Sequence, residues 1–453
     1  MDQPTGNKQL RLYNKDNQYK LSSVDEIIAN NLNTWKNWKC SAGVRSLYID
    51  YDGNVWIANC ASATHYGKVH DQQIKAFTND QTTVDQLWKE YRENIIGAYP
   101  HRDWIEKNTE QGWPMPKDNW ETCEQHIKLM ECITNLEKEF FKVPTNLGNA
   151  GHEIWQWKSK TSDDVWGLQG SIFTGWTTPT NWVTCPFSTC GCGADVILSK
   201  AKDDSSLNQL HVTTLGYKGQ ELGTFKDHAD PATGIEMNFP IDYQILWDIT
   251  RRCNYNCDYC WPSVHNNTEE HHDYNKIIET IDKAINDWSN GSSIRWNFGG
   301  GEPTMNPKFL DILKHLKQRN QWVLVTTNGS RSKKYWKEAS KYINSVNMSA
   351  HFDSMDKYPG NETRFIENCE IIINHHKEVS NDHWLEIKLM TPPGMLDRAI
   401  EFKNKIVNLG LDSIGANKRQ IGAISLVPIR DLADSSKLVG YSENELKFFQ
   451  QQE

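Results

Sequence analysis

The run Trp-Asp-Ile-Thr-Arg-Arg-Cys-Asn-Tyr-Asn-Cys-Asp-Tyr-Cys-Trp-Pro at residues 247–262 contains the most specific motif of this sequence. It places Cys253, Cys257 and Cys260 at Cys-x3-Cys-x2-Cys spacing, directly after an apolar segment typical of a strand. A tetrahedral zinc site is normally closed by four ligands, and a cubane iron-sulfur cluster is conventionally held by four cysteines. Three thiolates therefore leave one metal position open for a substrate or a cofactor.

A glycine turn follows the triplet in the sequence. Arg295 to Phe298 is typical of a strand and runs into Gly299-Gly300-Gly301-Glu302-Pro303. Glycines allow close backbone approach and positive φ, and a carboxylate can accept a hydrogen bond from an ammonium group. Such a turn alone is a weak signal, whereas its position after the triplet makes it a strong one.

Together, the two motifs resemble the radical S-adenosylmethionine (SAM) superfamily. The resemblance implies that Cys253, Cys257 and Cys260 hold a 4Fe-4S cluster whose open iron binds the amino and carboxylate groups of SAM. Tyr259 matches the aromatic residue before the third cysteine of the family motif. The family's Gly-Gly-Glu-Pro segment, which contacts the SAM amino group, corresponds here to Gly300, Gly301, Glu302 and Pro303.

A zinc knuckle or a set of buried structural thiols is the alternative interpretation of the triplet. Clustered cytosolic cysteines are more often metal ligands than disulfides. A fourth zinc ligand would then come from His265, His271 or His272. This alternative predicts neither the glycine turn nor the alternating strands and helices around both motifs.

Residues 241–453 alternate strand and helix patterns with short connections, which is typical of βαβ units and a parallel sheet. The predicted strands cover residues 243–249, 295–298, 322–329, 345–352, 384–390 and 421–429. The predicted helices cover residues 274–288, 306–317, 333–342, 363–375 and 396–407, and a capping box at 442–445 opens a last one. This pattern fits the α/β fold that the resemblance implies, a partial (β/α)6 barrel similar to a TIM barrel.

Active-site residues of such barrels lie at the C-terminal ends of the strands. Polar residues at or near these predicted ends are Thr327, Asn328, Ser349, His351, Asp353 and Lys388. Family resemblance makes Asn328 and Ser349 candidates for SAM binding, and it suggests Lys388 as a SAM contact or a catalytic residue. His351 is either a proton shuttle or a histidine simply satisfied within the barrel mouth.

Residues 1–240 hold 12 of the 19 tryptophans and lack the βαβ rhythm, so they are predicted to form a separate α+β domain. Alternating apolar residues on either side of Asp52-Gly53 predict a β-hairpin. Cys40 and Cys60 flank this hairpin and would lie near one another. A second group, Cys185, Cys190 and Cys192, follows residues 176–184 in a compact loop that contains two glycines.

These two groups resemble the SPASM and twitch auxiliary-cluster domains that accompany many radical SAM enzymes. Gly170-Ser-Ile-Phe is similar to the glycine-containing strand between the two groups in that family. Two departures are that the domain precedes the barrel here and that the second group has Cys-x4-Cys-x-Cys spacing. The resemblance implies one auxiliary 4Fe-4S cluster with a spare cysteine, and zinc in the same site is the alternative. Residues 72–146 are predicted to be an insertion with helices over residues 83–91 and 120–141.

Composition restricts the location and the partners of the protein. The 453 residues have a mean hydropathy of -0.70, and no apolar run is long enough for a membrane span. The start of the chain lacks the features of a secretory signal, so we expect a cytoplasmic protein without membrane partners. A net charge of -9 makes nonspecific nucleic-acid binding an unfavoured function.

The resemblance implies an enzyme that takes one electron from an external reductant and cleaves SAM to methionine and a 5'-deoxyadenosyl radical. This radical abstracts a hydrogen atom from the substrate, for which a peptide or protein is the leading class and a small molecule undergoing dehydrogenation the competitor. A noncatalytic iron-sulfur or zinc protein for electron transfer or interaction is the alternative from another class. The intact segment at residues 300–303 disfavours that alternative, because electron transfer needs no SAM site.

Overall fold

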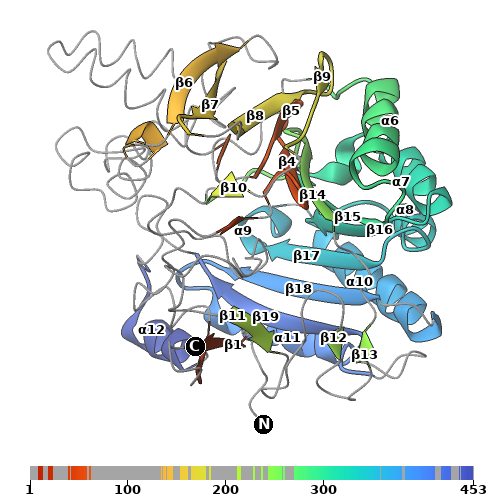
Figure 1. Ribbon diagram of the computed structural model, residues 1–453. Coiled ribbons are helices and arrows are strands. Elements are labelled where there is room, and N and C mark those ends of the chain that lie inside the picture. The colour runs from red at the N-terminus through yellow and green to blue at the C-terminus, as the bar shows by residue number, and fades with distance from the viewer. Residues whose placement is uncertain are drawn as a thin grey trace, which may run out of the picture.

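The structure is a computed structural model (Figure 1), and it describes most of residues 243–451 and parts of the preceding chain. Within 243–451 it leaves out residues 258, 261–269, 358, 380–382, 414–419, 430–437 and 439. Before residue 243 it describes residues 9–13, 19–23, 39–40, 42–58, 61–62, 134, 136–138, 140–145, 154–161, 165–179, 183–184, 212–215, 228–229 and 236–237.

Parallel strands in sequence order form the C-terminal part of one large sheet. They are β14 (Tyr243–Thr250), β15 (Ile294–Gly300), β16 (Trp322–Thr327), β17 (Ser345–His351), β18 (Trp384–Thr391) and β19 (Gly422–Pro428). The helices that follow them in turn are α6 (Tyr274–Lys283), α7 (Phe309–Gln318), α8 (Lys333–Ala339), α9 (Phe352–Met355), α10 (Asn361–Glu378), α11 (Leu396–Val407) and α12 (Glu443–Gln450). The predicted alternation of strands and helices is confirmed, and the protein has a mixed α/β fold.

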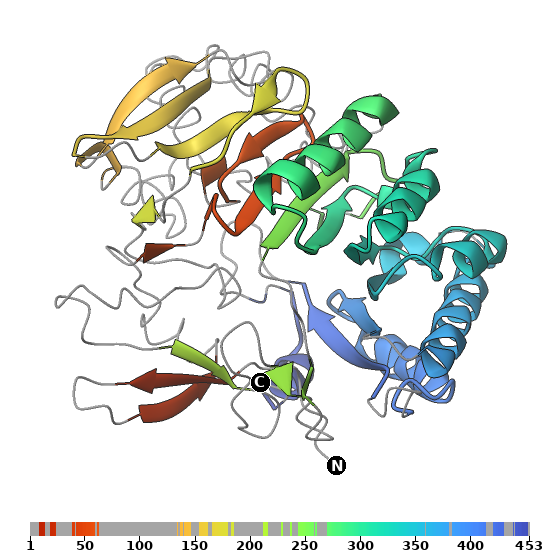
Figure 2. The ribbon, with the colours of Figure 1, turned by 45° about the vertical axis from the view of Figure 1, so that its right-hand side comes forward.

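The two faces of this parallel sheet differ in burial because side chains alternate along each strand. One face is fully buried and packs against the helices, which lie along one side of the sheet (Figures 1 and 2). Its core includes Trp247, Phe298, Met348 and Leu389 from the strands. The other face is only half-buried and carries polar side chains, so it is the face available to a ligand.

Two helices in this part differ in detail from the prediction. The helix expected from Asn306 and Pro307 begins at Phe309, because the Asn306 side chain accepts a hydrogen bond from the Lys308 backbone and so closes a turn before the helix. A short 3-10 helix, η7 (Pro303–Met305), precedes that turn. The expected helix 274–288 is present as α6, with its last turn in the π-helical segment η6 (Ala284–Trp288).

The N-terminal part of the chain continues the same sheet. Strand β4 (Ser46–Ile49) pairs in parallel with β14, and the strand order then runs β5, β8, β7, β6 with antiparallel pairing. These strands are β5 (Asn54–Trp56), β6 (Phe140–Thr145), β7 (Ile154–Ser159) and β8 (Val165–Ser171), and β9 (Gly175–Trp176) pairs with β8. Figure 1 shows β4 and β5 beside β14. The N-terminal region expected to be a separate domain therefore contributes strands to the sheet of the C-terminal part.

The N-terminal hairpin is confirmed, and one predicted helix is shorter than expected. Strands β4 and β5 form the hairpin, whose turn has Gly53 at a φ of 79°, a conformation that favours glycine. The helix expected to reach residue 141 gives way to strand β6 at Phe140. Its earlier part, apart from residues 134 and 136–138, and the helix predicted over 83–91 lie outside the described residues.

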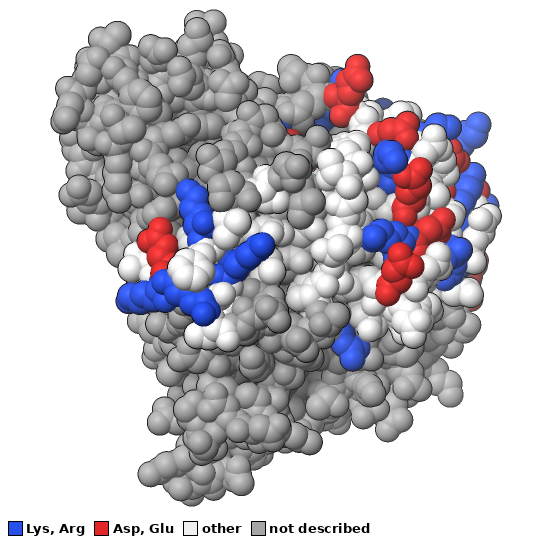
Figure 3. Space-filling view, turned by 45° about the horizontal axis from the view of Figure 1, so that its top comes forward, with Lys and Arg blue, Asp and Glu red and all other residues white. Residues whose placement is uncertain are grey.

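The remaining described strands form small separate pairings. These are β1 (Gln9–Tyr13) with β2 (Tyr19–Ser23) and β11 (Val212–Leu215), β3 (Lys39–Cys40) with β10 (Val183–Thr184), and β12 (His228–Ala229) with β13 (Glu236–Met237). A search of the described helices finds none long and apolar enough to cross a membrane. On the right-hand side of Figure 3, acidic and basic side chains are interspersed over the described surface.

Candidate functional site

The residues predicted to form the site come from neighbouring strand ends. The cysteine loop follows β14, the glycine turn ends β15, Asn328 follows β16, and His351 ends β17. Because these strands are parallel and adjacent, their C-terminal ends lie at one edge of the sheet. The fold thus gathers at this edge residues that span a hundred positions of the sequence.

Cys253, Cys257 and Cys260 are free cysteines of one loop and are mostly shielded from solvent. Burial raises the pKa of Cys253 and of Cys260 to about 12 and also raises that of Cys257. Nearby negative charges add to the rise in pKa, mainly Glu302 for Cys253, Asp353 for Cys257 and the Cys253 thiol for Cys260. Sheltered thiols whose pKa is raised by burial and by negative neighbours fit a cationic metal centre, whose charge makes a coordinating thiol a thiolate. This donor set therefore suits the cluster that the motif predicts.

The spacing of the three sulfur atoms also bears on the choice of metal. Among the described residues, one set of three possible metal-ligand atoms lies within 4.8 Å of one another, and it belongs to Cys257, His351 and Asp353. The three cysteine sulfurs do not form such a set, so at least two of them are more than 4.8 Å apart. Two thiolates on one tetrahedral zinc lie roughly 3.8 Å apart, given a Zn–S distance of about 2.3 Å. The wider spacing suits a cluster of several metal ions better than a single zinc.

The histidines considered as a fourth zinc ligand contact other groups. The Nδ1 atom of His271 lies 3.1 Å from the Thr250 hydroxyl, and the ring of His272 packs edge-on against Phe173 with the centroids 5.3 Å apart. His265 lies outside the described residues. In the part of the chain that the structure describes, no histidine therefore completes a four-ligand zinc site with the three cysteines.

The glycine turn packs directly on the backbone of the cysteine loop. The Gly301 backbone N–H donates to the Thr250 carbonyl at 2.7 Å, and the Glu302 N–H donates to the Arg252 carbonyl at 2.8 Å. A Cβ atom on Gly300 would lie 2.4 Å from the Thr250 oxygen, and one on Gly301 would lie 2.5 Å from the Arg252 oxygen. Both positions therefore require glycine, and Gly300 also has a φ of 101°.

Glu302 is buried, with 1% of its surface exposed, and its carboxylate accepts hydrogen bonds from two neighbouring segments. Oε1 accepts from the Thr304 backbone, the Thr304 hydroxyl and the Thr327 hydroxyl at 3.1, 2.6 and 2.8 Å. Oε2 accepts from the Asn328 backbone at 2.7 Å. Burial raises the pKa of Glu302 and these donors oppose that shift. Glu302 thus fastens the end of β15 to the end of β16, a role that the sequence did not reveal.

Polar groups contact two of the cysteine sulfurs. The Asn328 side-chain amide lies 3.8 Å from the Cys253 sulfur and donates to the Asn254 side chain at 3.0 Å. The Ser354 hydroxyl lies 3.5 Å from the Cys257 sulfur. A thiolate can only accept, so the Asn328 amide is placed to donate to metal-bound sulfur. The single proton of the Ser354 hydroxyl is directed at the Asp353 carboxylate, 3.4 Å away, and is shared between that carboxylate and the Cys257 sulfur. Ser354 was missed by sequence reasoning, because only the chain reversal after β17 brings it to the cysteine loop.

Tyr259, Asp353 and His351 form a hydrogen-bonded chain beside Cys257. The Tyr259 hydroxyl donates to Asp353 at 2.9 Å and lies 3.1 Å from the Nδ1 atom of His351. The Tyr259 hydroxyl has one proton, which it donates to Asp353. The proton between Tyr259 and His351 is therefore assigned to Nδ1 of His351. Burial lowers the pKa of His351 to about 4, so the ring is neutral near pH 7. Tyr259 and His351, predicted separately, are thus in direct contact.

Ser349 and Lys388 lie opposite one another on the half-buried face of the sheet. They are paired residues of β17 and β18. The Lys388 ammonium lies 3.4 Å from the Glu386 carboxylate, and both side chains are partly exposed. Both residues thus share the face that carries the polar side chains. The assignment of Tyr259, Asn328, Ser349, His351, Lys388 and residues 300–303 to SAM binding or catalysis remains a prediction.

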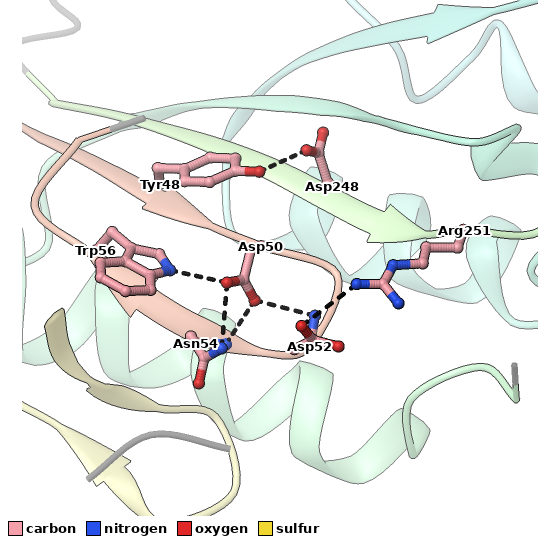
Figure 4. A network of polar contacts seen from close by, with 7 residues as sticks. All are labelled: Tyr48, Asp50, Asp52, Asn54, Trp56, Asp248 and Arg251. Atoms are coloured by element: carbon pink, nitrogen blue, oxygen red, sulfur yellow. Dashed lines mark hydrogen bonds and ion pairs between the residues drawn. The ribbon is translucent and has the colours of Figure 1, made fainter. Parts of the chain in front are cut away.

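A second polar network joins the N-terminal hairpin to the first strand of the parallel part (Figure 4). Asp50 is buried and accepts four hydrogen bonds, from the backbone of Asp52, the backbone and side chain of Asn54, and the indole of Trp56, at 2.8 to 3.1 Å. The Tyr48 hydroxyl donates to Asp248 at 2.7 Å. Through these contacts the hairpin is held against β14, the strand that leads into the cysteine loop.

Of the five N-terminal cysteines predicted to bind metal, Cys40 lies within the described residues. Cys40 lies in β3, where its Cα is paired with that of Val183 in β10. Cys60, Cys185, Cys190 and Cys192 lie outside the described residues, so the predicted auxiliary cluster stays a prediction.

Comparison with known proteins defines the class of the site. Residues 247–358, which contain the cysteine loop, the glycine turn and the Tyr259–Asp353–His351 chain, match the family model of the Radical SAM superfamily. This part of the chain therefore carries a radical SAM domain.

Individual relatives are similar to part of the chain. It is 31% identical over 119 residues to the GTP 3',8-cyclase of Actinobacillus succinogenes, an alignment that covers 25% of this chain and 34% of that protein. It is 32% identical over 85 residues to the tungsten-containing aldehyde ferredoxin oxidoreductase cofactor-modifying protein of Pyrococcus furiosus, covering 18% and 23%. The chain thus spans about a third or less of the length of these curated relatives.

A solved structure of Streptococcus suis SuiB, bound to the precursor peptide SuiA, aligns with a TM-score of 0.32 and 15% identity, covering 46% of this chain and 45% of SuiB. Nothing about the function of this chain follows from a likeness of that extent.

Proposed function

We propose that this protein is a radical SAM enzyme whose parallel strands and helices form the partial (β/α)6 barrel of that superfamily. The observation that carries the proposal is the placement of three free thiols on one loop, tied through backbone hydrogen bonds to the glycine turn of the next strand. A 4Fe-4S cluster on these thiols, reduced by an external one-electron donor, supplies the electron that cleaves SAM to methionine and a 5'-deoxyadenosyl radical, which then abstracts hydrogen from the substrate.

The chain's own residues hold and orient these groups. Cys253, Cys257 and Cys260 are the cluster ligands, Asn328 donates to the Cys253 sulfur, and the Ser354 hydroxyl lies beside the Cys257 sulfur. The residues proposed to contact SAM are Tyr259, Gly300, Gly301, Glu302, Pro303, Asn328 and Ser349. The half-buried polar face, with His351 and Lys388, is left for the substrate.

The test is cleavage of SAM by anaerobically reconstituted protein. With dithionite as reductant, the wild type is expected to release methionine and 5'-deoxyadenosine. Cys257→Ala should abolish this release, because it removes a cluster ligand. Cys369→Ala is the matched control, since that cysteine is buried in the core beside Met348 and belongs to no proposed site. Cleavage that survives Cys257→Ala, or a wild type that cleaves no SAM, would contradict the proposal.

We further propose that Cys40, Cys60, Cys185, Cys190 and Cys192 supply the ligands of an auxiliary 4Fe-4S cluster in a SPASM/twitch-like region within residues 1–240. The pairing of Cys40 with Val183 supports this, because Cys185 follows Val183 by only two residues in the sequence. Iron analysis is expected to find about eight irons per chain, on the basis of two cubane clusters. A content of about four irons with one zinc would instead assign zinc to the N-terminal site.

A peptide or protein is the substrate class that we propose, on the ground of the likeness of the N-terminal cysteine groups to auxiliary-cluster domains. A short peptide encoded beside this gene, added to the reconstituted enzyme, is expected to increase SAM consumption and to lose hydrogen in its mass spectrum. Stimulation by a small molecule in place of any peptide would shift the assignment to a small-molecule dehydrogenase.

A further inference from the structure

Arg251 is buried, with 3% of its surface exposed, and it lies two residues before the first cysteine of the loop. Its side chain leaves the end of β14 and reaches the turn of the N-terminal hairpin, more than 190 positions away in the sequence (Figure 4). A guanidinium is always charged and is costly to bury without partners. The contacts that compensate this charge therefore show what the residue does.

Two residues of the hairpin turn hold the guanidinium. Its Cζ atom lies 3.4 Å from the centroid of the Tyr51 ring, and Nη2 lies 3.3 Å from the Asp52 carboxylate. The turn itself is fixed, because Asp50 accepts hydrogen bonds from Asp52, Asn54 and Trp56. Arg251 is thus clamped by a rigid element rather than by mobile surface side chains.

The backbone on either side of Arg251 is held from the other direction. The carbonyl of Thr250 accepts from Gly301 and that of Arg252 accepts from Glu302. The start of the cysteine loop is therefore fixed on one side by the glycine turn, through the backbone, and on the other side by the N-terminal hairpin, through one side chain.

We propose that Arg251 is a positioning residue through which the N-terminal hairpin fixes the cysteine loop and favours the reduced form of the cluster. This inference rests on the proposed cluster at Cys253, Cys257 and Cys260. Reduction adds a negative charge to the cluster, and a fixed cation nearby stabilises that charge. The carboxylates of Asp52, Asp50 and Asp248 all lie near this guanidinium and oppose its effect on the cluster. Removing Arg251 and removing Asp52 therefore act on the cluster with opposite signs.

The experiment compares the fraction of reduced cluster at one fixed potential, measured by electron paramagnetic resonance on reconstituted full-length protein. Arg251→Gln is expected to lower the ratio of reduced to oxidised cluster about tenfold, the effect of a unit charge about 10 Å away at an effective dielectric constant near 20. Asp52→Asn is expected to raise the same ratio severalfold. Arg251→Lys keeps the charge but loses the planar stacking on Tyr51, so the ratio should stay within about twofold while SAM binds several-fold more weakly.

The matched control is Arg319→Gln, since Arg319 also pairs with a carboxylate, Asp282, but follows α7 at the opposite end of the strands. It should leave the ratio unchanged. If Arg251 had a purely structural role, Arg251→Gln and Asp52→Asn would change the ratio of reduced to oxidised cluster in the same direction. That result, or an unchanged ratio in both variants, would overturn the inference. Should Arg251→Gln fail to fold, Asp52→Asn decides the question alone, because a ratio that does not rise contradicts it. A wild type without a reducible cluster would instead refute the proposed function.

Discussion

The two parts of the large sheet are built in different ways. In β14 to β19, neighbours in space are neighbours in sequence, and each strand is followed by a helix that covers one face. In β4 to β8, the strands come from residues 46–56 and 140–171 and pair antiparallel. The parts meet where β4 pairs with β14 across about 200 residues of chain. The edge that carries the candidate site is therefore assembled from one local and one long-range unit.

The largest expected effect comes from separating the two parts. Deletion of residues 1–240 removes Leu47, Ile49, Val55, Ile172 and Trp176 from the shared core and exposes the edge of β14. Burial of each such side chain contributes about 1.5–3 kcal/mol, so the loss approaches the total stability of a domain, about 5–15 kcal/mol. We expect the 241–453 fragment to aggregate. A soluble fragment with a cooperative thermal transition would show that the parts are independent domains.

Sequence reasoning succeeded where the signals are local. Apolar periodicity located α11 at Leu396–Val407, and Asp52-Gly53 located the hairpin turn. The three cysteines and the glycine turn were found because their spacing is short and chemically specific. The pairing of β4 with β14 was not predicted, since the sequence of a four-residue strand does not indicate which distant strand it pairs with. The Ser354 and Arg251 contacts were missed for the same reason, because they exist only once distant segments meet.

The second prediction concerns the contact within the parallel part. Gly301→Ala would place a Cβ 2.5 Å from the Arg252 carbonyl, so the glycine turn and the cysteine loop must separate. We expect a loss of about 3 kcal/mol in the free energy of unfolding, as for overpacking at a rigid site, together with loss of SAM binding. Chemical denaturation and equilibrium dialysis with SAM measure the two effects.

The control for this variant is Gly291→Ala. Gly291 has a φ of 78° and no atom within 4 Å of an added Cβ, so the variant introduces backbone strain of about 1 kcal/mol without a clash. It should keep SAM binding. Equal losses in both variants would show that backbone freedom, rather than close packing on the cysteine loop, is what the glycine turn requires.

The third prediction uses the pH dependence of stability to test the contact between β4 and β14, where the two parts of the sheet meet. Burial raises the pKa of Asp248 to about 6, although the hydrogen bond from Tyr48 opposes the shift. The folded protein therefore binds more protons than the unfolded chain between about pH 4 and 6, and stability falls as the pH rises through this window. Asp248→Asn keeps an acceptor for Tyr48 and removes the titration. We expect the variant to gain up to about 2 kcal/mol relative to the wild type between pH 4 and pH 7.

Denaturation curves at several pH values measure this difference. Asp311→Asn, at a partly exposed carboxylate paired with Lys308 and far from β4, is the control. A constant offset for Asp248→Asn would mean that Asp248 does not titrate differently in the folded and the unfolded protein. A gain in stability with rising pH for Asp248→Asn but not for Asp311→Asn would instead show that burying Asp248 between β4 and β14 has an electrostatic cost.

The smallest effect is expected at a feature that the sequence located by itself, the capping box of α12. Ser442 and Glu445 exchange side-chain and backbone hydrogen bonds, as the sequence pattern predicted. Ser442→Ala removes one cap and should cost about 1 kcal/mol in the free energy of unfolding. Glu445 also accepts a hydrogen bond at 2.7 Å from the backbone of Gly394, in the connection between β18 and α11.

Glu445→Ala should therefore cost more than Ser442→Ala by about 1–2 kcal/mol, since a partly buried N–H loses its acceptor as well. Denaturation of the two single variants and of the double variant separates the contributions. If the cap were purely local, the two single variants would cost the same, and the double variant would cost little more than either. An excess for Glu445→Ala would show that even the most local element of the parallel part depends on a contact 51 positions away in the sequence, so that the two parts of the sheet differ in degree rather than in kind.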